Sequence, residues 1–114
     1  MQSWQTLCFS NELPESESRG FTLNGEEASP LAVVVVRKKG QVYAYRNLCP
    51  HAFIPLEWVP NEFLSFDKSL IQCANHGALF TIEEGLCVSG PCSGQSLIRL
   101  ETEETGGKIR IRSA

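Results

Sequence analysis

The sequence predicts an all-β fold, because short apolar runs alternate with turn signals and no long segment has helical periodicity. Residues 31–37 include four consecutive valines, and β-branched side chains favour the pleated surface of a strand. Glycine, proline and asparagine interrupt the chain at short intervals, as in small antiparallel sandwiches and barrels. The length of 114 residues suits a single domain with a modest core.

Strands are expected wherever an apolar or alternating run lies between turn residues. The predicted strands are residues 4–9, 21–23, 31–37, 41–46, 69–73, 78–82, 86–88, 96–100 and 108–112. Residues 31–37 are apolar on both faces, which indicates a strand in the middle of a sheet, and they should form a hairpin with residues 41–46. In the first strand, Trp4, Thr6 and Cys8 should share one face. The polar residues 14–20 are expected to form a loop.

Composition and charge exclude several function classes. The formal net charge is −3, and the basic runs 37–39 and 108–112 are interpreted as solvated strand faces, which argues against nucleic acid as a partner. The first residues show no signal-peptide pattern, and the longest aliphatic run, residues 31–36, is too short to cross a bilayer. We therefore expect a cytoplasmic protein with no membrane partner.

Two Cys–His pairs are the strongest chemical signal in the chain. Cys49 precedes His51 by two residues, Cys73 precedes His76 by three, and these are the only two histidines. Together they supply two thiolates and two imidazoles, which is a complete set of four metal ligands. A structural zinc ion accepts this set, although zinc fingers usually pair cysteine with cysteine and histidine with histidine. The mixed pairs, on loops between strands, match better a binuclear iron–sulfur centre with two cysteines on one iron and two histidines on the other.

The segments around these pairs resemble a known family. Residues 45–51 (YRNLCPH) and 73–80 (CANHGALF) are similar to the two cluster-binding boxes of Rieske-type [2Fe–2S] proteins. Residues 85–92 are similar to the proline-containing loop that covers the cluster in that family. The resemblance extends over roughly residues 31–112. It implies a Rieske-like antiparallel β sandwich or barrel as a single domain, residues 1–114, with a smaller cluster-binding tip at approximately residues 46–92.

The same resemblance assigns the ligands and the cofactor. It implies one [2Fe–2S] cluster per chain, with Cys49 and Cys73 on the inner iron and His51 and His76 on the outer iron. No catalytic residue is expected, because both histidines are committed to the metal and no dinucleotide-binding glycine loop is present. The implied function is one-electron transfer as a ferredoxin, from a reductase to a terminal oxygenase such as a ring-hydroxylating dioxygenase, without a small-molecule substrate of its own. The alternatives are a redox-sensing or accessory subunit, including one related to the small subunit of nitrite reductase, and a zinc-stabilised interaction module.

Departures from the high-potential members of that family point to a low reduction potential. Those proteins carry an extra cysteine in each box, which form a disulfide between the loops, whereas Ile54 and Asn75 occupy the corresponding stretches here. Their serine and tyrosine donors to sulfur correspond to Ala78 and Phe80, which have no hydroxyl. Fewer donors leave the reduced cluster less stabilised, so we expect a potential near the negative end of the Rieske range, about −150 to +300 mV.

The remaining features have a structural and a functional interpretation. In the segment between the pairs, Trp58, Phe63 and Phe66 are expected to form a small core beneath the cluster; alternatively, some of them join Phe53 and Ile54 in an exposed apolar rim for a redox partner. The other cysteines, Cys8, Cys87 and Cys92, are expected to be buried packing residues, a Cys87–Cys92 disulfide being disfavoured in the cytoplasm. The acidic residues are interpreted as solvated turn residues, or alternatively as a surface that steers a basic partner; they are Glu83, Glu84, Glu101, Glu103 and Glu104.

Overall fold

The structure is a computed structural model, and it describes residues 4–23, 31–50, 54–57, 59–75 and 77–113. These residues form antiparallel strands and one short 3-10 turn, Ser10–Glu12, so the all-β prediction is confirmed. The strands are β1 (Gln5–Phe9), β2 (Ser18–Leu23), β3 (Leu31–Lys38), β4 (Gln41–Arg46), β5 (Leu70–Gln72), β6 (Leu79–Thr81), β7 (Cys87–Ser89), β8 (Arg99–Thr105) and β9 (Lys108–Ser113). No helix long and apolar enough to span a membrane occurs in these ranges.

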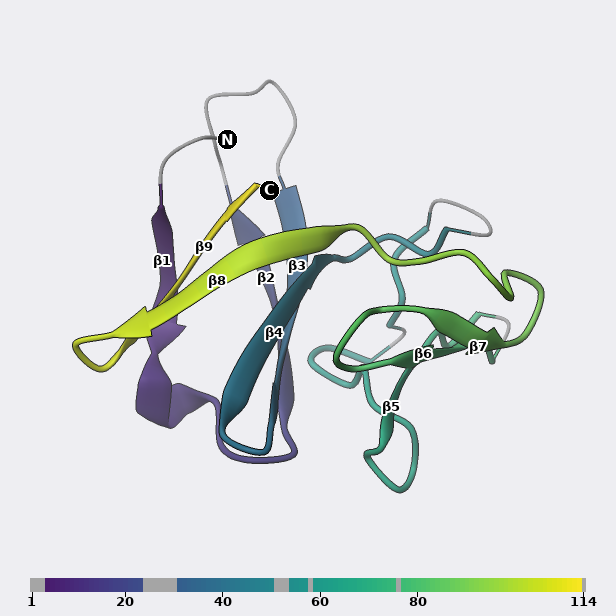
Figure 1. The fold of residues 1–114 in the computed structure, drawn as a ribbon, viewed down its shortest axis with the longest axis horizontal. Helices are drawn as coiled ribbons and strands as arrows, with labels where there is room; N and C mark the ends of the chain where they lie inside the picture. Colours follow the sequence, from purple (N-terminus) through teal and green to yellow (C-terminus); the bar gives the residue numbers. More distant parts are fainter. Residues whose placement is uncertain (1–3, 24–30, 51–53, 58, 76, 114) are drawn as a thin grey trace.

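The strands form two sheets of unequal size. The larger has six strands in the order β1-β9-β8-β4-β3-β2, and the smaller has three in the order β5-β6-β7. In Figure 1 the chain leaves the large sheet after β4, builds the small sheet beside it, and returns along β8. We call the six-stranded part the base and the three-stranded part, with its loops, the tip. The tip is therefore an excursion inserted between two paired strands of the base.

The valine run of β3 divides two hydrophobic clusters, because successive side chains of a strand point to opposite faces. Val33 and Val35 face one cluster, and Val34 and Val36 face the other. The base cluster contains Cys8, Leu13, Val33, Val35, Val42, Ala44, Leu100, Ile109 and Ile111. The tip cluster contains Val34, Val36, Tyr45, Cys49, Leu56, Phe63, Ile71, Cys73, Ala78, Phe80, Ile82, Cys87, Cys92 and Leu97. The predicted central strand, apolar on both faces, is thus confirmed.

Tertiary contacts shift three of the predicted elements. The expected loop 14–20 ends early, because β2 begins at Ser18 and pairs with β3 from that residue. Residues 96–98 lie outside β8, and Ser96 makes only an isolated bridge to Leu86. A register shift between Thr6 and Cys8 is a β-bulge, so Thr6 is exposed while Cys8 is buried. The prediction that these two side chains share a face is therefore wrong.

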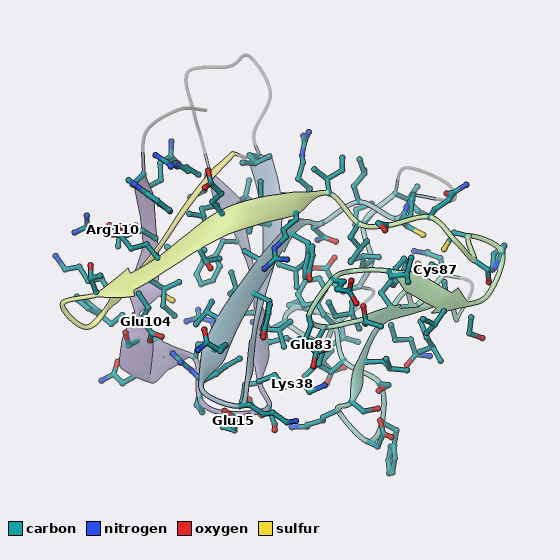
Figure 2. All side chains as sticks on the ribbon, in the orientation of Figure 1. Glu15, Lys38, Glu83, Cys87, Glu104 and Arg110 are labelled. Carbon is teal, nitrogen blue, oxygen red and sulfur yellow. The ribbon has the colours of Figure 1, made fainter. Side chains whose placement is uncertain are left out.

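Charged side chains fasten the strands to one another and to the tip. Arg37 of β3 contacts Glu104 of β8 at 2.6 Å, and its Nε donates to the carbonyl of Leu13 at 2.6 Å, so its predicted role as a solvated residue is wrong. The hydrogen bond from Arg37 lowers the pKa of the Glu104 carboxyl. Lys38 contacts Glu83 of the tip at 2.9 Å, and Figure 2 shows this pair between the two sheets.

Candidate metal centre

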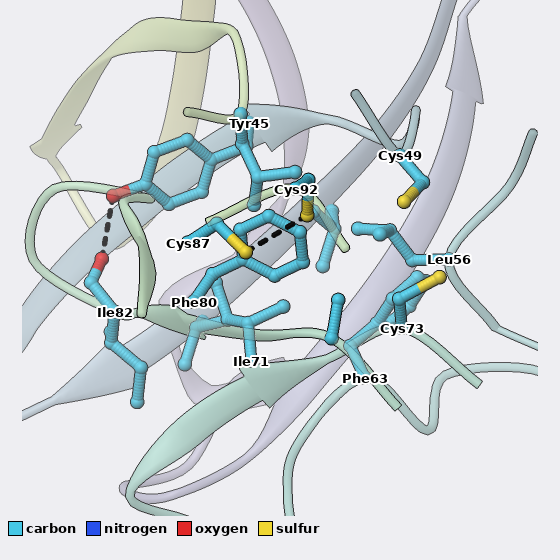
Figure 3. Packing of buried hydrophobic residues seen from close by; sticks show 14 residues of the cluster. Tyr45, Cys49, Leu56, Phe63, Ile71, Cys73, Phe80, Ile82, Cys87 and Cys92 are labelled. Atoms are coloured by element: carbon cyan, nitrogen blue, oxygen red, sulfur yellow. Dashed lines mark hydrogen bonds between the residues drawn. The ribbon is translucent and has the colours of Figure 1, made fainter. Parts of the chain in front are cut away.

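Cys49 and Cys73, the two predicted thiolate ligands, are both fully buried members of the tip cluster. Figure 3 shows their sulfur atoms at the same end of that cluster, with Leu56 beside them. The predicted imidazole ligands, His51 and His76, lie outside the described residues. The structure therefore brings together the cysteine half of the predicted ligand set.

Hydrogen bonds from the backbone and from one asparagine join residues 47–50 to residues 54–57. The N–H of Cys49 donates to the carbonyl of Ile54 at 2.8 Å. The buried side chain of Asn47 accepts from the N–H of Leu56 and donates to Glu57, both at 2.8 Å. Sequence reasoning did not single out Asn47. The sequence signal that could have identified Asn47 is its place as a polar residue inside a predicted ligand motif. If such an amide is buried, its hydrogen-bonding groups need partners, which the neighbouring backbone can supply.

The second loop, residues 73–78, holds Cys73 from both sides. The N–H of Cys73 donates to the carbonyl of Ala78 at 2.8 Å, and the N–H of Gly77 donates to the carbonyl of Cys73 at 2.9 Å. Gly77 has a φ of +67°, a left-handed conformation that costs glycine little. The two bonds thus fix the backbone of Cys73.

The two loops are bonded directly to each other. The N–H of Ala74 donates to the carbonyl of Leu56 at 2.8 Å, and the side-chain amide of Asn75 donates to the carbonyl of Pro55, also at 2.8 Å. The same Nδ2 lies 3.6 Å from the sulfur of Cys73 and donates toward it. In the sequence, Asn75 stands out only because it is not a cysteine. In the structure it joins the loops and is a donor to the sulfur of Cys73, a predicted ligand.

The predicted covering loop, residues 85–92, packs closely on the segment that follows Cys73. A Cβ at Gly90 would lie 2.8 Å from the Cα of Ala78, so only glycine fits there. Cys87 and Cys92 are buried in the tip cluster, which confirms their prediction as packing residues, and their sulfurs lie 2.8 Å apart. Burial raises the pKa of the Cys92 thiol to about 12.

Tyr45 fastens the tip to the base through its hydroxyl. The ring is fully buried, and the hydroxyl donates to the carbonyl of Ile82 at 2.6 Å (Figure 3). A Cβ at Gly85 would lie 2.7 Å from the same ring. Burial raises the pKa of Tyr45 to about 12. Tyr45, near the end of β4, therefore anchors the turn between β6 and β7.

The aromatic segment between the ligand pairs is only partly a core. Phe63 is fully buried, as the small-core prediction requires. Ile54, which the alternative placed on an exposed rim, is half-buried and packs against the tip cluster. Phe66, however, is fully exposed, which contradicts the small-core prediction and agrees with the alternative of an exposed aromatic side chain. Phe66 lies in a tight turn at residues 65–69, in which the carboxylate of Asp67 accepts from the backbone and the hydroxyl of Ser69. Trp58 and Phe53 lie outside the described residues.

Most of the acidic residues singled out in the sequence are engaged in ion pairs. Glu101 and Glu103 belong to strand β8 and contact Arg112 and Arg110 of β9, so their prediction as turn residues is wrong. Glu104 also lies in β8, where it binds Arg37. These carboxylates hold strands together and do not gather into an acid–base pair.

The chemistry of the described donors suits a soft metal centre. Two buried thiols lie among the apolar side chains of the tip cluster, and backbone and amide hydrogen bonds hold the segments that carry them. Thiolate is the ligand that zinc and iron–sulfur clusters select. An amide N–H directed at the sulfur of Cys73 would stabilise the charge of such a ligand.

Comparisons with known proteins agree on one family. The model of the Rieske [2Fe–2S] domain matches residues 3–104. The ferredoxin CarAc of Metapseudomonas resinovorans is 29% identical over 92 residues, which cover 81% of this chain and 78% of that protein. A chain in the complex of reduced oxygenase and oxidised ferredoxin in carbazole 1,9a-dioxygenase superposes with a TM-score of 0.73 at 25% identity, covering 97% of this chain and 94% of that one.

Longer proteins contain the same fold as a part. A component of 2-oxoquinoline 8-monooxygenase superposes with a TM-score of 0.77 at 27% identity. A chain in a carbazole-bound oxygenase and ferredoxin complex of carbazole 1,9a-dioxygenase gives 0.78 at 24% identity, a similarity of fold alone. This chain spans 26% and 27% of those two chains. The base-and-tip architecture therefore occurs both in a chain of this size and within larger ones.

Proposed function

The chain belongs to the Rieske [2Fe–2S] domain family, and on that premise we propose that it carries single electrons to an oxygenase through one [2Fe–2S] cluster. Cys49 and Cys73 would hold the inner iron, and His51 and His76 the outer iron. The observation that carries the proposal is the pair of buried cysteines on two loops that are hydrogen-bonded to each other. The cluster-binding subdomain would then be approximately residues 46–92, within one domain of residues 1–114.

The residues around the cysteines would orient the cluster and keep water from its inner side. When bound, the cluster supplies a one-electron couple. Leu56 and Phe80 are fully buried and belong, with Cys49 and Cys73, to the hydrophobic tip cluster. The inner iron would therefore lie in an apolar environment. Asn75 would donate to the Cys73 thiolate. The hydrogen bonds between the two loops would keep Cys49 and Cys73 in fixed positions relative to each other.

The proposed partners are a reductase as donor and a terminal oxygenase as acceptor. The support is the likeness to a ferredoxin and to a chain in a complex that contains an oxygenase and a ferredoxin. In this role the chain is an electron-transfer protein and leaves the chemistry on the substrate to its partner. The proposed location is the cytoplasm, as expected from the sequence.

The proposed reduction potential lies in the lower half of the Rieske range. Ala78 and Phe80 are fully buried and carry no hydroxyl that could donate to sulfur. Asn75 supplies one longer bond of 3.6 Å. Fewer and weaker donors stabilise the reduced, more negative cluster less, so voltammetry should give a midpoint below about +75 mV, the centre of that range.

Replacement of ligands tests the proposal. Cys73→Ala and His51→Ala should each abolish the visible absorbance of the purified protein and the rhombic EPR signal after dithionite reduction, because each removes a ligand. Cys8→Ser, in the base cluster, is the matched control and should retain both signals. Stoichiometric zinc in a colourless wild-type protein would overturn the electron-carrier proposal in favour of a zinc-stabilised module.

A further inference from the structure

Cys87 and Cys92 lie closer together than two unbonded sulfur atoms normally do. Their sulfurs are 2.8 Å apart, about 0.8 Å longer than a disulfide bond of about 2.05 Å. Unbonded carbon atoms, which are smaller than sulfur, already prefer about 3.5–4.0 Å. Figure 3 shows the two side chains pointing at each other inside the tip, with Cys92 on the side nearer to Cys49.

The backbone holds both cysteines in this position independently of their sulfurs. Gln95 bonds to both of them: its carbonyl accepts from the N–H of Cys87 at 2.8 Å, and its N–H donates to the carbonyl of Cys92 at 2.9 Å. The N–H of Gly94 donates to the carbonyl of Cys87 at 3.2 Å. Closing the last part of the distance between the sulfurs would therefore need little movement of the backbone.

We propose that Cys87 and Cys92 form a reversible disulfide that locks the covering loop. Each thiol loses its hydrogen, one S–S bond forms, and two protons and two electrons leave the pair. The oxidant is a small disulfide of the glutathione type, which accepts the two electrons and both protons and leaves as two thiols. The reverse exchange with free thiols reopens the pair.

The disulfide would close a ring of six residues, 87–92, that carries the contact of the loop with the ligand turn. Gly90, within that ring, packs on Ala78, whose carbonyl accepts from the N–H of Cys73. Oxidation would therefore restrict the opening of the loop over the second cysteine of the centre. The pair itself consists of described residues and does not depend on the cluster.

Thiol counting under a defined redox poise tests the proposal on the full chain with its metal bound. The protein is equilibrated with mixtures of reduced and oxidised glutathione, quenched in acid, denatured and alkylated, and then analysed by mass spectrometry. The reduced protein should take up five labels, one for each cysteine, and the oxidised protein two fewer. In the oxidised protein, the peptide that contains Cys87 and Cys92 should carry no label and have a mass two hydrogens below that of the unlabelled dithiol peptide.

Two variants and a second readout identify the pair. In Cys87→Ser, every remaining thiol should take up a label at all redox poises. In Cys8→Ser, the oxidised protein should still take up two labels fewer than the reduced protein. Hydrogen exchange of the amides of residues 87–95 should slow on oxidation of the wild type and remain unchanged in Cys87→Ser. Five labels at every poise, or a disulfide that includes Cys49 or Cys73, would overturn the proposal. Because the visible spectrum is recorded on the same samples, loss of the cluster is distinguished from failure of the disulfide.

Discussion

Asn75 shows how a single residue takes on more than one task at the candidate centre. Where high-potential relatives are expected to place a cysteine that forms a disulfide between the loops, this amide donates to the carbonyl of Pro55 across the same gap. It also donates toward the sulfur of Cys73 at 3.6 Å. One side chain therefore substitutes for a covalent link and supplies a donor that Ala78 and Phe80 cannot.

Removing this amide should lower the reduction potential. Asn75→Leu keeps a similar volume but has no donor, so the reduced cluster loses a stabilising bond. If that bond favours the reduced form by about 1 kcal/mol, the midpoint falls by roughly 40 mV, since tenfold in a one-electron equilibrium is about 59 mV. Voltammetry measures the shift. Asn75→Gln, which retains a donor, is the control, and an unchanged midpoint in Asn75→Leu would rule out a tuning role.

Tyr45 should make stability depend on pH in the alkaline range. Its pKa rises from an ordinary value of 10.0 to about 12 in the folded protein, because burial disfavours the charged phenolate. As the pH rises, the Tyr45 phenol ionises at a lower pH in the unfolded chain than in the folded protein. Its contribution to the free energy of unfolding is therefore complete below pH 10 and declines up to about pH 12. The decline amounts to roughly 2–3 kcal/mol. Urea unfolding at several pH values should show it in the wild type and in Tyr43→Phe, but not in Tyr45→Phe.

At the scale of elements, the covering loop needs a glycine at position 90 for two reasons: its backbone conformation and its close approach to Ala78. Gly90 and Gly94 both have positive φ, +106° and +90°, so alanine is strained at either position. Only at Gly90 would the new Cβ meet backbone, 2.8 Å from the Cα of Ala78, whereas nothing lies within 4 Å at Gly94. The two positions form a matched pair.

Substitution should separate these two effects. Gly90→Ala should reduce the free energy of unfolding by about 1–3 kcal/mol more than Gly94→Ala, because it adds a steric clash to the same backbone strain. Chemical denaturation of both variants measures the difference. Equal losses would mean that the covering loop moves away from Ala78 without cost.

Most strands could be predicted from the sequence because their signals are local. The valine run and the alternation of residues 41–46 depend only on neighbouring side chains, and β4 has the predicted bounds. What could not be predicted depends on distant partners. Ser18 joins β2 because its hydroxyl and the backbone of Gly20 bond to Asn61, which is more than 40 residues away.

The candidate centre follows the same division. Cys49 and Cys73 could be picked out because the spacing of a Cys–His pair is a local pattern. Asn47, Gly90 and the double role of Asn75 could not, since each acts on a loop whose position the sequence does not specify. Phe66 was expected in the small core because aromatic character does not reveal the turn in which it lies exposed.

At the scale of the whole molecule, the two hydrophobic clusters give the base and the tip separate sources of stability. The base cluster contains neither Cys49 nor Cys73, and β3 and β4 lie between it and the tip cluster. The tip has only a short three-stranded sheet, and small sheets are marginal without further support. Ligation is therefore expected to stabilise the tip more than the base.

Removal of the metal should reveal this difference. After treatment with an iron chelator, hydrogen exchange should accelerate at residues 54–57 and 70–95, while the amides of β3, β8 and β9 stay protected. Mass-spectrometric exchange on matched holo and apo samples measures both regions at once. Uniform acceleration over the whole chain would show that base and tip unfold as one unit.

The exposed turn at Phe66 has a practical consequence. It lies between Cys49 and Cys73 in the chain, and its ring is fully accessible to a protease that cuts after aromatic residues. A single cut there would place the two thiolates on separate fragments, joined by the bonds from Ala74 to Leu56 and from Asn75 to Pro55 and by the surrounding packing. The colour of the cluster would then report whether the two halves of a split protein have come together.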